Sequence, residues 1–405
     1  MTLRGWPPLI CWVLGMRCMT DPCYAGVWGT EPVLGILGNY ATDPALLNLV
    51  HSAETHAALL LDAPTAYNAD AFSLTVLPSF RIGDSRGYAS TASNYAHLAA
   101  KGEWASERGS LSVSSAIARD SSLAHDYVFN GSAGVRRQSA MADIDWNQQW
   151  TEKFSLNTDF NVSRVRYAQA LGAPSLTDYS NSSFSPTISW AESESNKLTA
   201  SSSVGLYKSL DGTTRSTNSN VQLGFVRHLN ELWTVTTSAG YSRANDKINT
   251  FREVLAIVNN RPVIRVVPTT LKSTQNGSVF SVALTHQGDR LSVRAVASRQ
   301  LVPSGFAFLS RQQTYTLGAS YPLSQRWTVN GDARYTQSSD PSLQGIYTDR
   351  TVRYVGISSI WHWTEKWNIA TNASRVMETF QSNQYKPAST EFSIELSRQF
   401  DRVKF

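Results

Sequence analysis

Residues 150–162 read Trp150-Thr-Glu-Lys-Phe154-Ser-Leu-Asn-Thr-Asp-Phe160-Asn-Val162. A large apolar residue leads into a short charged turn, a second one leaves it, and apolar and polar residues then alternate. Successive side chains of a β-strand point to opposite faces, so this strand has one apolar and one polar wall. Such a strand fits a surface that meets lipid on one side and water on the other.

The same unit recurs along the chain, and the segments between its copies are longer and polar. Short turns at one rim and long loops at the other are typical of an outer-membrane β-barrel whose short turns face the periplasm. The short turns fall within Trp104 to Leu111, Trp150 to Phe154, Trp190 to Leu198, Leu229 to Trp233, His286 to Leu291, Leu323 to Trp327 and Trp363 to Trp367. The long loops are 83–93, 120–130, 169–179, 210–217, 245–274, 301–311, 338–348 and 381–387.

The pattern predicts an all-β fold, a transmembrane antiparallel up-and-down barrel of about 18 strands. Residues 26–405 form one barrel domain, and 26–70 supply its first strand pair, with a rise from Trp28, a descent ending at Asp62 and a turn over 63–70. If the barrel has 16 strands instead, 26–70 become a periplasmic arm or plug. Both numbers are even, as single-chain barrels require. A soluble propeller also repeats at this length, but it needs four strands per repeat rather than two.

The N-terminus reads as an export signal, residues 1–25. Arg4 precedes an apolar core, and cleavage after Ala25 fits the preference for small residues. A misplaced start codon or a buried helix is the alternative. No stretch approaches the 18 or so apolar residues of a transmembrane helix.

The amino-acid composition argues against several classes of function. All three cysteines (Cys11, Cys18 and Cys23) lie in the leader, so the exported chain has no disulfide framework or thiolate metal site. The net charge of +5 comes from scattered arginines rather than a basic block, which argues against nucleic-acid binding. No cofactor, metal site or catalytic residue is expected.

Most of the 12 tryptophans lie at or beside the short turns. Indole prefers the headgroup layer of a membrane, so we predict a tryptophan belt at one membrane interface. Its members are Trp104, Trp146, Trp150, Trp190, Trp233, Trp327, Trp361, Trp363 and Trp367.

Charged residues on the polar strand faces are candidates for lining a water-filled lumen. Structural pairing across strands is the alternative explanation. The candidates are Asp143, Asp145, Asp159, Arg294, Asp332, Arg334 and Glu395. By the same alternation, Leu156, Val204, Leu223, Val282, Val329 and Ile394 are predicted to face lipid, and Asn157, Ser203, Gln222, Asn330 and Glu395 to face the lumen.

The longest loop, 245–274, contains two apolar runs around Asn259-Asn-Arg-Pro262 and reads as a hairpin. It either extends the wall above the membrane, which we favour, or folds inward as a constriction. Apolar strands gain little in a wet lumen.

An enzymatic barrel is the main rival class. His125-Asp126 lies in a long loop, as catalytic Asp and His do in outer-membrane proteases, but no second acidic pair accompanies it. No histidine sits in mid-strand on the lipid face, where a phospholipase would need one. We therefore expect no enzyme.

The chain ends on Phe392-Ser-Ile-Glu-Leu-Ser-Arg-Gln-Phe400 and five further residues closing at Phe405. An alternating last strand with a terminal aromatic is similar to the signal read by the barrel-assembly machinery, and either phenylalanine could serve.

Several stretches resemble an outer-membrane β-barrel porin family of Gram-negative bacteria, some members of which are linked to exopolysaccharide export. The resemblance spans most of residues 28–400 and implies fold and location more than cargo. It rests on Leu77 to Gly87, Trp104 to Gly109, Arg119 to Ser122, Leu176 to Tyr179, Asp211 to Thr214 and Gly240 to Arg243.

Together these features predict a porin-like channel or export conduit of the Gram-negative outer membrane, with exopolysaccharide or small solutes as cargo. A non-catalytic structural or surface-binding barrel and an outer-membrane hydrolase are the alternatives. The expected partners are outer-membrane lipid and lipopolysaccharide, the barrel-assembly machinery and no nucleic acid.

Overall fold

The computed structural model describes residues 27–43, 53–86, 94–121, 136–168, 176–258, 261–303, 309–339, 349–380 and 386–404. No helix within these ranges is long and apolar enough to cross a membrane. The strands found there are β1 (Val27–Thr30), β2 (Val33–Ala41), β3 (Glu54–Asp62), β4 (Thr65–Asn68), β5 (Phe72–Arg86), β6 (Tyr95–Ser106), β7 (Gly109–Ser121), β8 (Arg136–Gln149), β9 (Phe154–Tyr167), β10 (Tyr179–Ala191), β11 (Asn196–Ser209), β12 (Thr214–His228), β13 (Trp233–Val258), β14 (Arg261–Gln287), β15 (Ser292–Pro303), β16 (Leu309–Ser324), β17 (Trp327–Ser339), β18 (Asp349–His362), β19 (Trp367–Phe380), β20 (Ala388–Gln399) and β21 (Val403–Lys404).

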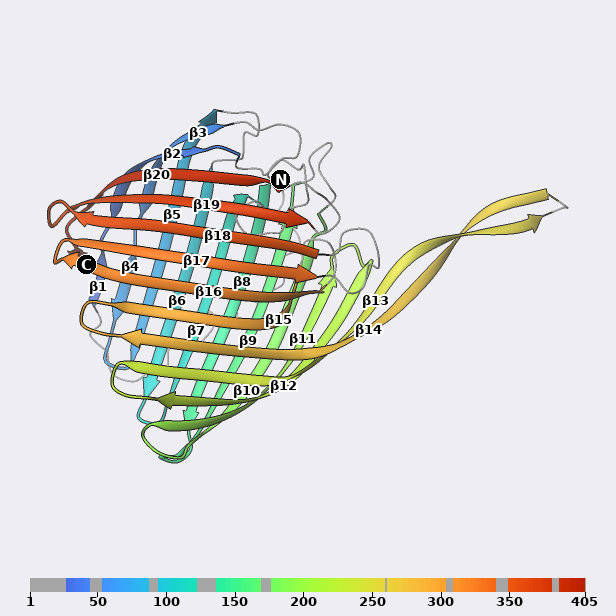
Figure 1. The fold of residues 1–405 in the computed structure, drawn as a ribbon, viewed down its shortest axis with the longest axis horizontal. Helices are drawn as coiled ribbons and strands as arrows, with labels where there is room; N and C mark the ends of the chain where they lie inside the picture. The colour runs from blue at the N-terminus through green and yellow to red at the C-terminus, as the bar shows by residue number, and fades with distance from the viewer. Residues whose placement is uncertain are drawn as a thin grey trace.

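Of the described strands, 18 form a closed antiparallel barrel, namely β2, β3 and β5 to β20 (Figure 1). Each strand from β5 to β19 pairs with the next, and β3 pairs with both β2 and β5. The first and last barrel strands then pair with each other, with Ile36 opposite Leu396. The prediction of 18 strands is confirmed. The 16-strand alternative is wrong, because β2 and β3 are part of the wall.

Three adjacent strands are interrupted at the short-turn end of this closure. The short strands β1, β4 and β21 continue the lines of β2, β3 and β20, and they pair only among themselves and with β5. Proline has no N–H to donate to a ladder, and Pro32 and Pro64 stand at two of the interruptions. The turn predicted over 63–70 is therefore wrong in its centre, which is β4.

The short turns have side-chain caps that explain their sequence motif. The hydroxyl of Thr364 accepts hydrogen bonds from the backbone N–H groups of Lys366 (3.2 Å) and Trp367 (3.1 Å). In another turn, the Asn230 amide oxygen accepts from Leu232 and Trp233 at 3.0 and 2.9 Å. A Thr, Asn or Ser at the start of the turn thus stabilises the tight reversal between long strands.

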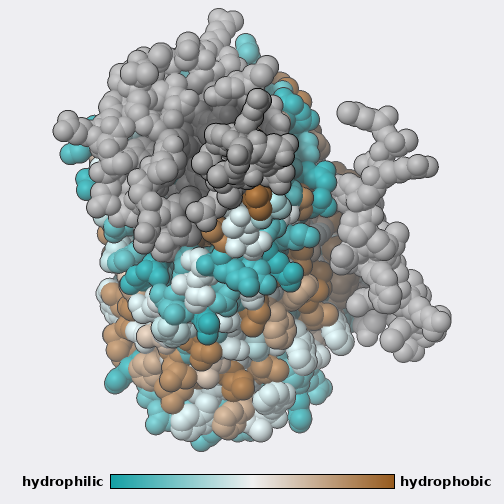
Figure 2. All heavy atoms as spheres, turned by 90° about the vertical axis from the view of Figure 1, so that its right-hand side faces the viewer, coloured by the Kyte–Doolittle hydropathy of each residue, from teal (hydrophilic) through white to brown (hydrophobic). Residues whose placement is uncertain are grey.

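Many large apolar side chains are exposed on the outer face of the wall, and Figure 2 shows groups of them among more polar residues on one side. Leu223 is 70% exposed, Ile394 57% and Val204 54%, whereas a soluble protein would bury such residues. Their neighbours in sequence point to the interior. An apolar outer band around a closed barrel is the surface that a bilayer requires.

The long segment 245–274 forms the far end of β13 and β14, which pair as far as Val258 opposite Arg261. Figure 1 shows this hairpin projecting well beyond the barrel instead of turning into it. The favoured prediction of an extension is confirmed. We call the part in which the two strands pair only with each other, 249–258 and 261–270, the ribbon.

Close packing of backbones at one inward glycine gives a testable consequence. A Cβ on Gly240 would collide with the backbone oxygen of Val221, whereas a Cβ on the inward Gly318 would meet nothing within 4 Å. Gly240→Ala should therefore destabilise the barrel by about 1–3 kcal/mol and Gly318→Ala should not. The measurement is the temperature at which the folded band is lost on an unheated gel. Equal shifts for both variants would contradict the predicted crowding.

Candidate functional site: the inner wall of the barrel

Charged residues gather on the inner face of β8 and β9. Asp145 stands opposite Asp159 in the ladder, and Asp143 stands opposite Asn161. The Asn161 amide donates to Asp143 at 3.2 Å, and Asn157 donates to both carboxylate oxygens of Asp145 at 3.3 Å. These three carboxylates, the acidic wall, lie on the face opposite to the exposed side chains of their strands.

A second charged group lies on β15 to β17. Arg294, Gly318 and Asp332 follow one another across three strands on one rung. Adjacent strands are about 4.8 Å apart, so the Cα atoms of Arg294 and Asp332 are roughly 10 Å apart with open space over the glycine between them. Arg334 lies on the same face of β17. Glu395 is separate, on β20 between the exposed Ile394 and Leu396.

The structure therefore does not bring the seven predicted lumen residues into one site. Five strands, β10 to β14, separate the acidic wall from the charges of β15 to β17. The part that these residues play in passage stays a prediction.

The intervening five strands form an uncharged wall. Between Lys197 near the short turns and Asp246 near the long loops, their inward positions contain no Asp, Glu, Lys or Arg. The inward direction follows from the outward exposure of Val221 (63%), Phe184 and Val282 on the same strands. Ser, Thr, Asn, Gln and Gly occupy most of these positions.

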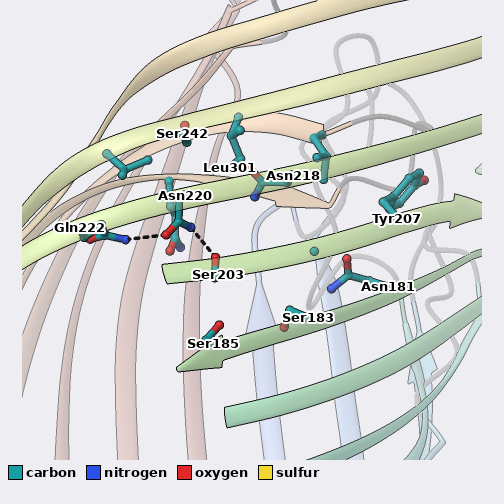
Figure 3. Close-up of a pocket in the computed structure, with 14 residues that line it drawn as sticks. Asn181, Ser183, Ser185, Ser203, Tyr207, Asn218, Asn220, Gln222, Ser242 and Leu301 are labelled. Carbon is teal, nitrogen blue, oxygen red and sulfur yellow. Dashed lines mark hydrogen bonds between the residues drawn. The ribbon is translucent and has the colours of Figure 1, made fainter. Parts of the chain in front are cut away.

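A cavity of about 220 Å³ lies against the uncharged wall (Figure 3). Its polar groups are ordered by hydrogen bonds. The Asn220 amide donates to the Ser203 hydroxyl at 2.6 Å and accepts from Gln222 at 3.4 Å. The Ser238 hydroxyl donates to Gln222 at 3.0 Å. The lining residues are Asn181, Ser183, Ser185, Ser203, Gly205, Tyr207, Asn218, Asn220, Gln222, Ser242, Val279, Gln300, Leu301 and Leu309.

An apolar cluster closes the cavity toward the long loops. Tyr207 is 1% exposed, and its ring centroid lies 5.3 Å from that of Tyr179. Leu176 and Leu309, at the described ends of two loops, pack into the same cluster. The loop ends thus lie against the inner wall and narrow the interior there. We call this group the loop-end cluster: Val165, Tyr167, Leu176, Tyr179, Tyr207, Ala244 and Leu309.

The sequence analysis placed Ser203 and Gln222 toward the lumen, but it did not identify the uncharged wall as a site, and it did not find the loop-end cluster. The wall was visible as a signal, because Ser, Asn and Gln repeat at every second position of β10 to β12. The list of candidate site residues contained only charged residues, so this wall was not included. The loop-end cluster depends on how loops fold back, and alternation within strands does not encode that.

The predicted tryptophan belt lies beside the short turns, where seven of its nine members are exposed. Trp233 instead packs against the ring of His286, with centroids 4.5 Å apart. The guanidinium of Arg398 lies 5.6 Å from the ring centroid of Trp367 and 5.0 Å from that of Phe400. A cation beside aromatic rings suits a headgroup layer, and contact with that layer stays a prediction.

The rival catalytic candidate, His125-Asp126, lies outside the described residues, as does the leader 1–25. His228 and His362 sit beside short turns and contact Thr234 (2.9 Å) and Asn368 (2.6 Å). Within the described ranges, no group of three His, Cys, Asp or Glu side chains could hold a metal ion.

No family model matches the chain, and no curated protein matches it in sequence. Among solved structures, the chain is similar to the outer membrane protein opdK from Pseudomonas aeruginosa, at 9% identity and a TM-score of 0.46, over 92% of this chain and 99% of that one. OccK2 (OpdF) of the same organism, in complex with glucuronate, is 10% identical with a TM-score of 0.45, over 95% of this chain and 100% of that one. The copper transporter OprC is 11% identical with a TM-score of 0.47, over 94% of this chain and 81% of that one. By its own geometry, the chain is a closed 18-stranded β-barrel of the outer-membrane type.

Proposed function

We propose that the barrel is a porin-like passage of the Gram-negative outer membrane for hydrophilic, uncharged solutes rich in hydroxyl groups. The uncharged wall of β10 to β14 is the observation that supports this. A barrel of this width is not filled by its strand side chains and holds water, a plug or loops. A solute beside this wall meets hydroxyls and amides that can replace its water hydrogen bonds.

Charge is the argument against ionic cargo along this wall. A solute carboxylate would lose part of its hydration beside Asn218, Asn220 and Gln222 without gaining a cationic partner there. Amide groups both donate and accept, so they match hydroxyl groups in either orientation. Sugars are the abundant solutes with this chemistry. Exopolysaccharide export is the finer form of the proposal, with a glycan chain sliding along the wall.

We also propose that the outer surface of the barrel contacts membrane lipids. The apolar outer band and the predicted belt suit contact with outer-membrane lipid and lipopolysaccharide. Export by the leader and assembly through the C-terminal strand belong to the same proposal. We propose no catalytic step for the barrel.

Purified barrel in planar bilayers and in liposomes tests the passage. We expect stable conductance steps, and faster liposome swelling with a neutral oligosaccharide than with an anionic one of equal size. Silent bilayers together with no swelling would contradict a passage. Equal or greater uptake of the anionic sugar would contradict the preference for neutral solutes.

Asn220→Asp tests the uncharged wall directly. The substitution keeps the size of the side chain and places a negative charge beside Ser203 and Gln222. In water, two charges 4 Å apart interact by about 1 kcal/mol, so uptake of the anionic sugar should be slower by roughly fivefold. Uptake of the neutral sugar should change little.

The matched control is Ser324→Asp, at the short turn between β16 and β17. This control adds the same charge away from the uncharged wall. If both variants slow the anionic sugar equally, only the overall charge matters and the wall has no special part.

A further inference from the structure

Among the strands that the structure describes, none pairs with the ribbon on either side, so it is a two-stranded sheet. Pairing of β12 with β13 ends at Thr214 opposite Ile248, and pairing of β14 with β15 begins only at Phe280 opposite Arg299. Ten residues of each strand continue for roughly 33 Å, paired only with each other. An isolated two-stranded hairpin is marginally stable in water, so a third strand would stabilise it.

The first free edge belongs to β13, and its backbone groups are available. The N–H of Asn249 donates to the backbone oxygen of Thr213 at 2.7 Å, so the peptide groups of this residue point toward the β12 side. Every second residue of a strand points its backbone groups the same way. The N–H and C=O groups of Phe251, Glu253, Leu255 and Ile257 therefore point to this side, where no described strand continues.

The second free edge belongs to β14, and prolines interrupt it. In the ladder, Pro268 stands opposite Phe251 and Pro262 stands opposite Ile257, so both prolines belong to the set that points away from β13. Proline has no N–H, which leaves Ile264 and Val266 as the donors between them. Proline on an edge is a common protection against unwanted pairing. One edge of the ribbon is thus protected and the other is open.

The ribbon and the residues next to it have a local excess of basic residues. Residues 247–273 contain five basic residues and one acidic residue, which gives four of the net +5 of the whole chain. Two ribbons would repel each other, which disfavours a second copy as the occupant. A negatively charged segment would be attracted. Val266 is 60% exposed, and Leu271 55%, so apolar cover is lacking as well.

We propose that the open edge of β13, residues 251–257, binds an extended acidic polypeptide segment of another protein on the long-loop side. The segment adds to the ribbon as a third strand. Main-chain hydrogen bonds to an exposed sheet edge supply affinity in this mode of recognition, and side chains supply specificity. The positive charge of the region favours an acidic segment over a neutral one and speeds its approach.

The ladder offers a matched pair of variants. Leu255 and Ile264 face each other on one rung, and the N–H of each points away from the partner strand. Leu255→Pro removes a donor from the open edge, and Ile264→Pro removes one from the protected edge. Both replace an aliphatic residue by proline at a position outside the internal ladder of the ribbon, so any general damage should be equal.

The probe is a labelled synthetic peptide of about ten residues that alternates valine and glutamate, long enough to span the edge. It is titrated against the whole barrel in nanodiscs, and fluorescence anisotropy is read. We expect saturable binding to wild type and to Ile264→Pro. Binding to Leu255→Pro should be weaker by about tenfold or more, because a hydrogen bond is lost and the proline ring obstructs the incoming strand.

A second peptide of the same sequence with N-methylated alternate amides separates strand addition from attraction of charges, and it should bind little. Three results would overturn the proposal. They are no binding to wild type, equal binding by both proline variants, and self-association of the barrel that Leu255→Pro abolishes while the peptide does not bind. Binding of dextran sulfate equal to that of the peptide, unchanged by Leu255→Pro, would instead indicate a site for anionic glycans.

Discussion

Val221→Arg should prevent most of the barrel from assembling, whereas Gln222→Arg should leave assembly nearly intact. Val221 lies at the middle of β12, and its side chain is 63% exposed on the outer face. An arginine on the lipid face near the middle of the membrane costs about 2–4 kcal/mol, because the charge cannot stay hydrated there. The measurement is the folded fraction on gels with and without boiling.

Gln222 is the matched control because it is the next residue on the same strand and lines the cavity. An arginine there remains in contact with water, so the loss should be limited to the hydrogen bonds with Asn220 and Ser238. This control should also shift ion preference toward anions. Equal damage by the two substitutions would mean that the strand does not separate lipid from water.

Depth decides which outward residue gives the clearest result. Val329 also faces outward by alternation, but it lies two residues from Trp327 at the short-turn rim. The cost of a charge falls to about 0–1 kcal/mol near the interface, because long side chains reach the headgroups. The central position in β12 is therefore the better test.

Alternation within strands made most of the wall predictable from sequence. Leu223 and Ile394 were placed outward by a period of two, and they are exposed in the structure. The seven short turns were predictable because short charged segments recur between aromatic or large apolar residues. These signals are local, so one strand and its turn are enough to read them.

Features that depend on more distant parts of the chain were not predictable. The sequence predicts a turn over 63–70, whereas pairing with β1 and β5 makes 65–68 a strand. The burial of Tyr207 also depends on parts of the chain that are distant in sequence. Its position in β11 predicts an inward side chain, but its contact with Leu176 and Leu309 depends on where two loops return.

Strand alternation and loop packing determine different features of the inner wall. Strand alternation sets the chemistry of the passage, an uncharged wall beside an acidic one. The loop ends set its width near the long-loop rim, where Tyr207 and Leu309 also line the cavity. In the proposed passage we therefore expect substitutions in the uncharged wall to alter charge preference and substitutions in the loop-end cluster to alter the size limit.

Tyr207→Ala should both weaken the barrel and widen the passage. The side chain is 1% exposed and packs in the loop-end cluster, and removing a buried aromatic ring costs about 3–5 kcal/mol. The folded band should be lost at a lower temperature, and single-channel conductance should rise because the ring no longer supports Leu176 and Leu309 against the wall. Tyr207→Phe keeps the ring, so it should stay near wild type in conductance. If Tyr207→Ala leaves conductance unchanged while it lowers stability, the loop-end cluster is a structural anchor and the narrowest part of the passage lies elsewhere.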